Sequence, residues 1–403
     1  MTATTGVGRG AGPVRQASLR EHNLGLVLRQ VANALAPISR AAVAAATGLT
    51  RATVSSLVEE LIAGRLLLET EPSPRSGAGR PAVGLALAPD GVAGLGLEVN
   101  VDYLAACVVD LTGAVRHSAV LPGDRRGRPP GETLRALADL AADAVATSTA
   151  PIAGATLAVP GLVRPDGLVR TAPNLGWRGV DVRADLCIRG LDLAPAGLAV
   201  DNEANLAALG ELHAGAASSF LYVSGEVGIG AGIVLDGRLF RGARGFSGEI
   251  GHVAVRPDGP PCRCGAHGCL EQYAGQEAIL RAAGLVPGRP GEAAGRLAVA
   301  AERGNPAVLA ALAEAGRALG VVLAGVVNVI DVPTVVLGGL YVPLATWLSP
   351  AVRSEVDTRV LTADWESVEV VPARLGVRAA AVGAAGSVVR AVRDDPARWL
   401  ARG

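Results

Sequence analysis

The chain has 403 residues and half of them are apolar, so it is long enough for two or three domains with real cores and too apolar to be disordered. It contains no Lys, and its 37 Arg balance 37 acidic residues, which gives a formal net charge of zero. This balance excludes nucleic-acid binding through overall charge and leaves only a local basic patch for that purpose.

The chain begins without an apolar signal core, and its longest apolar run, Val321 to Ile330, is too short to span a bilayer. That run predicts a buried helix. Cysteine is sparse and clustered, which favours a reducing compartment and a metal site over disulfides. We therefore expect a soluble cytoplasmic protein with no membrane partner.

The first ninety residues predict a disordered segment, 1–17, and then a winged helix-turn-helix domain with its linker, 18–88. Ser18 is expected to cap an amphipathic helix, Ser39 a second helix through Thr47, and Thr50 a third, with Gly48 at the sharp turn between the last two. Two segments, Leu66 to Glu69 and Val83 to Leu87, are expected to form the strands of a wing. The alternative is an ordinary helical hairpin within a larger helical domain.

Polar residues gather at the start of the predicted third helix, where side chains can reach base edges or phosphates in a major groove. Up to Pro89 the chain has nine Arg against five Glu, a local basic surplus. The segment Pro72 to Pro81 has the composition of a flexible linker, and its Arg80 either enters a minor groove or is a plain linker residue. The predicted DNA-binding residues are Ser39, Arg40, Thr50, Arg51, Thr53, Ser55, Ser56 and Arg80.

From Asp90 the pattern changes to strands separated by turns. Strands are expected at Val92 to Val99, Tyr103 to Asp110, Val115 to Val120 and Ala153 to Val159, with a helix at Glu132 to Ala146. This is the order of one lobe of an actin-like ATPase fold, in which the first hairpin cradles phosphate with Gly and a small hydroxyl residue. Here the turn carries Glu98 and Asp102 without Gly, so a phosphate site at this turn is expected to be disabled.

The polar segment Val159 to Trp177 is expected to be a loop, in which Thr171, Asn174 and Trp177 line a pocket, unless Trp177 is simply part of the core. A helix is expected to begin around Asn202. It would place Asp201, Asn202 and Glu203 at its amino terminus, facing a cleft, although simple capping is the alternative.

A second Gly-rich hairpin follows the expected strand Phe220 to Val223, with Gly228, Gly230 and Gly232 in its turn and second strand. Glu226 again places a carboxylate where a phosphate would bind. The carboxyl-terminal part predicts a helix at Ala307 to Val327 and strands at Thr334 to Leu337 and Val368 to Val371.

One loop concentrates metal-binding residue types. His252, Cys262, Cys264 and Cys269 offer one imidazole and three thiolates, the set that closes a tetrahedral structural zinc site; His267 could replace His252. The neighbouring Glu249 and Glu271 are then free for another task, such as binding hydroxyl groups.

Together these motifs resemble the ROK family (repressors, open reading frames and sugar kinases). The resemblance covers about Ser18 to Arg393. It rests on the helix-turn-helix from Ile38, the G-R-P of the linker, the D-N-E-A-N from Asp201 and the G-E-I-G-H and C-R-C-G-A-H-G-C-L-E signatures that end at His252 and Glu271. It implies an α/β protein in which the winged helix-turn-helix precedes a two-lobed actin-like (ROK, hexokinase-like) domain at 89–403, with a cleft near residue 200.

The resemblance also implies roles. It assigns structural zinc to His252, Cys262, Cys264 and Cys269. It assigns sugar binding to Asn174, Asn202, Glu203, Glu249, His252 and Glu271. A His that binds zinc through one nitrogen can hydrogen-bond a hydroxyl through the other, so the two roles of His252 are compatible.

Three departures from the kinase members of the family point away from catalysis. Glu203 replaces the catalytic Asp and displaces the carboxylate by one methylene, and both phosphate motifs are altered, with Glu98 and Asp102 in the first and Glu226 in the second. We therefore expect a sugar-responsive regulator, a repressor of a carbohydrate-utilisation operon, with operator DNA and a sugar as partners and a homodimer or homotetramer as its assembly. The alternative is an ATP-dependent sugar kinase with an appended DNA-binding domain.

Overall fold

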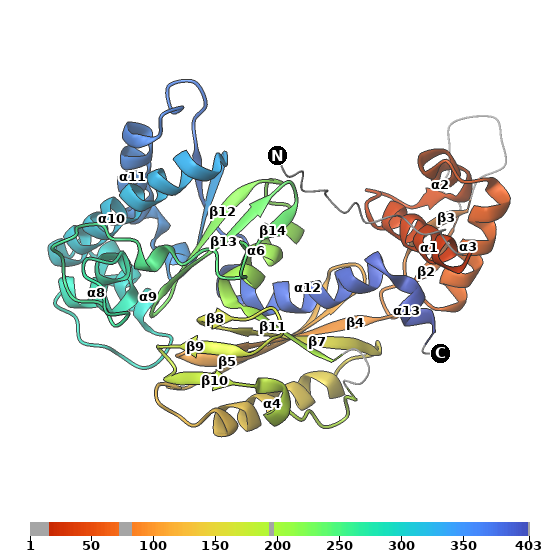
Figure 1. Ribbon diagram of the computed structural model, residues 1–403, viewed down its shortest axis with the longest axis horizontal. Helices are drawn as coiled ribbons and strands as arrows, with labels where there is room; N and C mark the ends of the chain where they lie inside the picture. The colour runs from red at the N-terminus through yellow and green to blue at the C-terminus, as the bar shows by residue number, and fades with distance from the viewer. Residues whose placement is uncertain (1–15, 72–82, 193–196, 402–403) are drawn as a thin grey trace, which may run out of the picture. The chain divides into compact units, whose positions relative to one another are not determined.

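The computed structural model describes residues 16–71, 83–192 and 197–401 (Figure 1). The chain divides into two compact units, which we describe separately. The first unit comprises Met1–Val92 together with Val389–Gly403, and the second comprises Ala93–Val388. The predicted linker and Arg80 lie outside the described residues, as do residues 1–15 of the predicted disordered segment.

In its described residues the first unit has three helices and a small antiparallel sheet with strand order β1-β3-β2, together with the end of a long helix from the second unit and a short carboxyl-terminal helix. The elements are α1 (Gln16–Ala32), β1 (Ile38–Ser39), α2 (Arg40–Thr47), α3 (Arg51–Ala63), β2 (Leu67–Thr70), β3 (Gly84–Leu87) and α13 (Pro396–Leu400). This is the predicted winged helix-turn-helix. The alternative of a plain helical hairpin is excluded, because β2 and β3 pair as a wing.

Local capping explains the helix-turn-helix. The Ser39 side chain accepts from the Ala42 amide and the Thr50 side chain from the Thr53 amide, while Gly48 has φ 72° and ends α2. The bend between α2 and α3 is 116°. The expectation that Ser18 caps α1 is wrong, because the helix already begins at Gln16; this also places residues 16 and 17 in a helix rather than in the disordered segment.

The second unit contains two five-stranded sheets, each the centre of a lobe. In the amino-terminal lobe, Ala93–Asn202, the sheet has the order β11-β7-β4-β5-β6. Its elements are β4 (Ala93–Val99), β5 (Tyr103–Asp110), β6 (Val115–Pro122), α4 (Pro130–Ala146), β7 (Ile152–Val159), β8 (Leu162–Val163), β9 (Val169–Ala172), β10 (Trp177–Val180), α5 (Val182–Asp185) and β11 (Leu198–Asn202).

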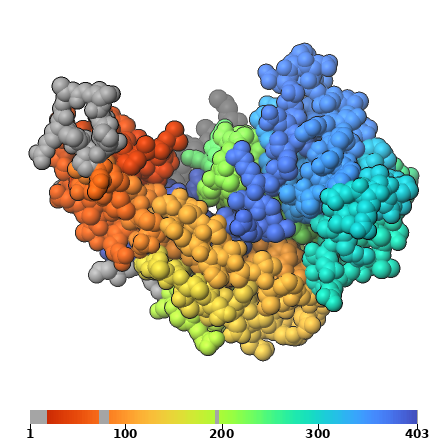
Figure 2. Space-filling model, turned by 180° about the vertical axis from the view of Figure 1, so that it is seen from behind, coloured from red at the N-terminus to blue at the C-terminus, as the bar shows by residue number. Residues whose placement is uncertain are grey.

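In the carboxyl-terminal lobe, Phe220–Pro372, the sheet has the order β14-β13-β12-β15-β16. Figure 2 shows this lobe in green, cyan and blue and the amino-terminal lobe in orange and yellow. The elements of the carboxyl-terminal lobe are β12 (Phe220–Gly225), β13 (Ile229–Leu235), β14 (Arg238–Phe240), η1 (Ile250–His252), α7 (Glu271–Ala274), α8 (Gln276–Ala282), α9 (Ala293–Glu302), α10 (Pro306–Ile330), β15 (Thr334–Gly339), α11 (Tyr341–Arg359) and β16 (Glu369–Pro372).

The two sheets share one topology. Each begins with an antiparallel meander of three strands and is completed by two strands that run parallel to the first strand of the meander. This duplicated arrangement is the actin-like fold predicted from the order of the strands.

Between the sheets lie α6 (Glu203–His213) and α12 (Ala379–Asp394), with the short η2 (Gly376–Arg378) before α12. These helices approach closely because Gly occurs at the contacts. A Cβ atom at Gly383 would come within 1.8 Å of the Leu206 carbonyl oxygen, and one at Gly96 within 1.9 Å of the Ala381 carbonyl oxygen. Backbones can approach this closely only where there is no side chain.

The segment Val159 to Trp177 differs from its prediction as a loop. Short strands β8, β9 and β10 form a separate antiparallel sheet, with order β10-β9-β8. Trp177 is 2% exposed and packs in the core of the amino-terminal lobe, so the expectation that it lines a pocket is wrong. Its indole Nε1 donates to the Arg128 carbonyl oxygen at 3.4 Å.

The helix α10 contains the apolar run Val321 to Ile330 and is longer than predicted. Among the described residues it has the length and composition of a membrane-crossing helix, and the bent pair of α2 and α3 passes the same test only when taken together. In the window that passes, 61% of the α10 residues are buried within the structure. Residues such as Leu312, Leu319 and Leu323 form the core of the carboxyl-terminal lobe, which explains the apolar composition of the helix.

Candidate functional site

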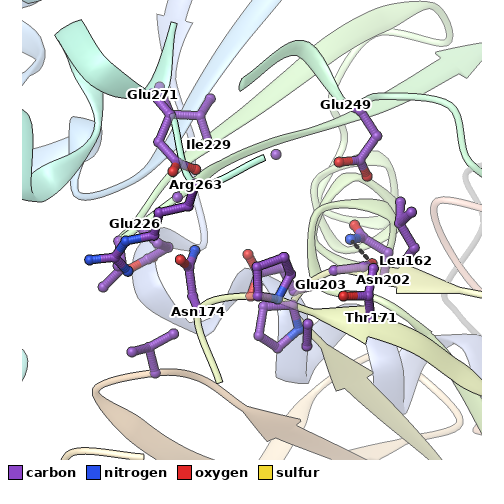
Figure 3. A pocket seen from close by; sticks show the side chains of 18 of the residues that line it. Leu162, Thr171, Asn174, Asn202, Glu203, Glu226, Ile229, Glu249, Arg263 and Glu271 are labelled. Carbon is purple, nitrogen blue, oxygen red and sulfur yellow. Dashed lines mark hydrogen bonds between the residues drawn. The ribbon is translucent and has the colours of Figure 1, made fainter. Parts of the chain in front are cut away.

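A cleft of about 400 Å³ lies between the two lobes of the second unit (Figure 3). Its polar lining comes from loops at the ends of strands in both lobes, as is common for ligand sites in α/β folds. The lining includes all the residues predicted to bind sugar: Asn174, Asn202, Glu203, Glu249, His252 and Glu271. Thr171, expected to line a pocket, is there as well.

The start of α6 positions one wall of the cleft. Asn202 caps the helix by accepting from the Ala204 and Asn205 amides, and its Nδ2 donates to the Gly161 carbonyl at 2.9 Å. Glu203 therefore begins the helix with its carboxyl group directed to the cleft (Figure 3). The segment therefore both caps α6, through Asn202, and faces the cleft, through Glu203.

Asp201 does not face the cleft, contrary to expectation. Its carboxylate accepts from Asn205 Nδ2 at 3.0 Å and from Arg241 Nη2 at 2.6 Å. Arg241 follows β14, so this ion pair joins the amino-terminal lobe to the carboxyl-terminal lobe beside the cleft.

Three carboxyl groups, those of Glu98, Glu203 and Glu226, gather where the β4–β5 and β12–β13 hairpins approach the start of α6. Burial raises the pKa of Glu98 to about 7, although a hydrogen bond from Tyr103 at 2.8 Å opposes the shift. Burial, then the charges of Glu98 and Glu249, raise the pKa of Glu203 to about 8, and burial raises that of Glu226 well above its ordinary range. One oxygen each of Glu98 and Glu203 is buried without a hydrogen-bond partner.

The space between these carboxyl groups is about 10 Å³, enough for about one water molecule. Tyr103, Tyr222 and Ser224 are among the other residues that line it. A phosphate group has no room here and would meet carboxyl oxygens rather than amide donors.

Asp102 has a different environment from the one predicted. It was expected to repel phosphate with a free charge, but its carboxylate accepts from Arg126 at 2.9 Å and from Gln276 at 3.2 Å. It is 6% exposed, so its charge is neutralised within the structure. Because Gln276 belongs to the carboxyl-terminal lobe, Asp102 links the two lobes instead.

One group of side chains in the second unit has the composition and spacing of a metal site. The ligand atoms of His252, Cys262, Cys264 and Cys269 all lie within 4.8 Å of one another. His252 Nδ1 is 3.8 Å from Cys262 Sγ, and Cys264 Sγ is 3.6 Å from Cys269 Sγ. Tetrahedral zinc with bonds of about 2.3 Å separates two sulfur ligands by about 3.8 Å, so these positions fit the ion.

The loop that carries these ligands is held by its own backbone. The Cys262 amide donates to the Ala266 carbonyl at 2.8 Å, and Ala254 pairs with Cys269 as an isolated bridge. Gly268 has φ 67°, and a Cβ atom there would come within 1.6 Å of the Arg256 carbonyl oxygen, so only Gly fits. The group contains His252 and not His267.

In the first unit the amino terminus of α3 is polar and accessible. Arg51 and Ser56 are exposed, Thr53 and Ser55 are half-buried, and Thr50 is exposed but engaged with Thr53 through its hydroxyl at 2.9 Å.

The remaining described candidates for DNA contact lie at the start of α2. Ser39 accepts from the Ala42 amide, and Arg40 pairs with Glu69 of the wing. Part of the Arg40 guanidinium is therefore occupied in the absence of DNA.

Arg178 and Arg263 also line the cleft, and neither was predicted from the sequence. Arg263 lies between two of the Cys residues, and its position in the metal loop could have indicated that it faces the same cleft. Arg178 follows the buried Trp177 on β10, and only the alternation of that strand would have suggested exposure.

The fold and site together define a class: a sugar-kinase-like protein of two actin-like lobes, preceded by a winged helix-turn-helix. The family model described as "ROK family" matches residues 94–390, and the chain belongs to the ROK family.

Two curated relatives and one solved structure illustrate the similarity. The xylose repressor of Bacillus subtilis is 31% identical over 93% of this chain and 96% of that protein. The glucokinase of Streptomyces coelicolor is 30% identical over 72% of this chain and 97% of that protein. The crystal structure of a ROK family transcriptional regulator, a homolog of the E. coli MLC protein, has a TM-score of 0.77 at 24% identity and covers 96% of this chain and 100% of its own.

Proposed function

We propose that this chain is a sugar-responsive DNA-binding transcriptional regulator that represses a carbohydrate-utilisation operon. The observation that carries the proposal is the presence, in one chain, of a winged helix-turn-helix with a polar α3 amino terminus and a sugar-kinase-like cleft, beside which three Glu side chains leave a space of only about 10 Å³. The relatives support it, because the xylose repressor matches nearly the full chain while the glucokinase matches only 72% of it.

In this proposal Asn174, Asn202, Glu203, Glu249, His252 and Glu271 bind the hydroxyl groups of the sugar. Hydrogen bonds from hydroxyls to charged groups contribute roughly 1.5–3 kcal/mol each, so a few of them select one sugar epimer. The Oδ1 atom of Asn202 is engaged in capping, so Asn202 contributes mainly by holding Glu203 in place.

Operator DNA is contacted by the first unit. Arg51 and Ser56 enter the major groove, with Thr53 and Ser55 beside them. Ser39 and Thr50 fix the two helix starts and point their amides at phosphates. Arg40, which pairs with Glu69 in the absence of DNA, binds a DNA phosphate instead. Arg80 contacts DNA from the linker.

Zinc is the metal that this donor set prefers, and we assign it to His252, Cys262, Cys264 and Cys269. Three thiolates and one imidazole leave no open position, so the ion braces the loop that carries Glu249, His252 and Glu271. Reduced thiolates suit the cytoplasm, where we place the protein.

The mechanism is linkage between two sites. A homodimer or homotetramer, with DNA-binding domains at 18–88 and sugar-binding domains at 89–403, binds a pseudo-palindromic operator. A sugar that binds better to the DNA-free state weakens operator binding by its difference in affinity for the two states.

The alternative function is a sugar kinase, which the glucokinase relative favours. The three carboxyl groups of Glu98, Glu203 and Glu226 argue against it, because they fill the narrow space beside the hairpins and leave no room there for a phosphate. A coupled assay with ATP and the same sugars distinguishes the two functions: sugar-dependent ADP release at ordinary enzyme rates would establish the kinase.

The experiment that tests the proposal is fluorescence anisotropy of the purified protein on DNA from upstream of its own gene, at fixed salt, with a panel of sugars. We expect specific binding that one sugar weakens. Absence of specific binding with and without every sugar would remove the DNA-binding function.

A further inference from the structure

A second cavity of about 200 Å³ adjoins the cleft on the side of the metal loop. The two share Asn174, Val227, Arg263 and Glu271 as wall residues. In Figure 3 Asn174, Arg263 and Glu271 lie at one end of the cleft, away from Thr171, Asn202 and Glu249 at the other. The end of a ligand that binds Glu271 therefore faces the second cavity.

The second cavity is polar and carries no net charge. Its Arg263 and Arg281 balance Glu271 and Glu277, and Arg263 Nη2 lies 3.1 Å from Glu277 Oε2. Gln272, on α7, adds an amide group to the lining. A balanced set of this kind suits a neutral group with many hydroxyls better than a phosphate or a carboxylate.

The cleft itself favours a neutral ligand over an anion. Its two Arg residues are Arg178 and Arg263, and Arg263 already pairs with Glu277, so little positive charge is left to neutralise an anion.

The lining of the second cavity also has an apolar part. Val227 and Ala278, each 6% exposed, face the second cavity. A sugar ring presents hydroxyls at its edge and C–H groups on its face, so apolar and polar walls together match a second ring.

We propose that the effector is a neutral saccharide of at least two linked units, with one unit in the cleft and the next in the cavity lined by Gln272 and Arg281. Gln272 and Arg281 donate hydrogen bonds to hydroxyls of the second unit. This inference rests on the proposed function and deepens it by naming the class of effector.

Isothermal titration calorimetry on the full zinc-containing chain tests the inference with matched pairs: D-xylose and xylobiose, D-glucose and cellobiose, D-glucose and maltose. In one pair we expect the disaccharide to bind about tenfold more tightly than its monosaccharide. Gln272→Ala and Arg281→Ala should each lower the disaccharide affinity about tenfold and leave the monosaccharide affinity within about twofold. Arg303→Ala, an exposed Arg after α9, is the matched control and should change neither.

Equal or weaker binding of every disaccharide overturns the inference, as does an equal loss for both ligands of a pair in the two variants. Tighter binding of glucose 6-phosphate than of any disaccharide also overturns it. In each of these cases the proposed function stands, because a sugar still binds. If no saccharide of either length binds, the proposed function fails together with the inference.

Discussion

At the scale of the residue, Glu98 shows how a buried carboxyl group makes the stability of the fold depend on pH. Its side chain is 2% exposed, one of its oxygens has no partner, and its pKa is raised from 4.5 to about 7. An acid whose pKa is raised by folding destabilises the folded state as the pH rises, because the unfolded chain loses the proton first. The destabilisation is absent below pH 4.5, grows as the pH rises, and is complete above pH 7.

Replacing Glu98 with Gln should therefore increase the free energy of unfolding by about 3 kcal/mol above pH 7 and change it little near pH 4.5. The amide keeps an oxygen that can accept from Tyr103, so the hydrogen bond survives. Urea denaturation from pH 4.5 to 8.5 measures the difference. The matched control is the exposed Glu302→Gln; a Glu98→Gln effect that is the same at every pH would contradict the explanation.

The thiolates of the metal loop carry a second prediction at this scale. Cys262→Ser should abolish stoichiometric zinc binding and lower the melting temperature, because the loop loses its brace and the buried Cys269 loses its partner ion. Zinc content by atomic emission, together with calorimetry, measures both. Cys187→Ser, at an exposed position outside the loop, should leave both unchanged. Zinc retained at full occupancy in Cys262→Ser would refute the assignment.

At the scale of the element, the closest helix packing in the second unit depends on Gly383. A Cβ atom there would overlap the Leu206 carbonyl, so α6 and α12 must separate to accept one. Gly383→Ala should destabilise the protein by about 1–3 kcal/mol by overpacking.

The control is Gly325→Ala on α10, where a Cβ atom meets nothing within 4 Å. This change should stabilise the protein by up to about 1 kcal/mol, because Ala suits a helix better than Gly. Denaturant unfolding measures both variants. Equal effects of the two substitutions would show that the contact between α6 and α12 is not responsible.

The helix α3 carries a prediction about DNA. Arg51→Ala should lower affinity for the operator and reduce the slope of log affinity against log salt by about 1, because one phosphate contact is lost. Anisotropy at several salt concentrations gives the slope. Arg20→Ala, whose Arg pairs with Glu60 on α3, is the control for charge alone. If both variants lower the slope equally, Arg51 makes no specific contact.

Elements whose signals are local were predictable from the sequence. The caps Ser39 and Thr50 and the stripe of Val54, Leu57 and Val58 lie within one turn or two of the helices that they define. The metal ligands lie within one loop, and their types alone indicate the chemistry.

Features that depend on contacts between distant segments were not predictable. Asp102 looked like a free charge until Arg126 and Gln276 were placed beside it. Val389–Gly403 belongs with the first unit, and its sequence gave no sign of this. The strands β8 to β10 are too short for an alternating pattern to stand out, so their segment looked like a loop.

At the scale of the whole molecule, the fold combines a winged helix-turn-helix unit with a two-lobed unit in which three carboxyl groups gather beside the β4–β5 and β12–β13 hairpins. Two contacts join the lobes of this unit: the Asp201–Arg241 ion pair, at 2.6 Å, and the Asp102–Gln276 hydrogen bond, at 3.2 Å. A ligand that changes the separation of the lobes must change these contacts. Sugar binding in the cleft can therefore change the arrangement of the two lobes as well as the site itself.

The most direct test of the linkage is the affinity of the effector sugar measured by calorimetry with and without saturating operator DNA. Coupling free energies are reciprocal, so we expect operator DNA to weaken sugar binding by the same factor by which sugar weakens operator binding. A factor of about 5–150 is typical of such coupling. If the affinity for the sugar is the same with and without operator DNA, the two sites are not coupled and the protein is not a sugar-released repressor.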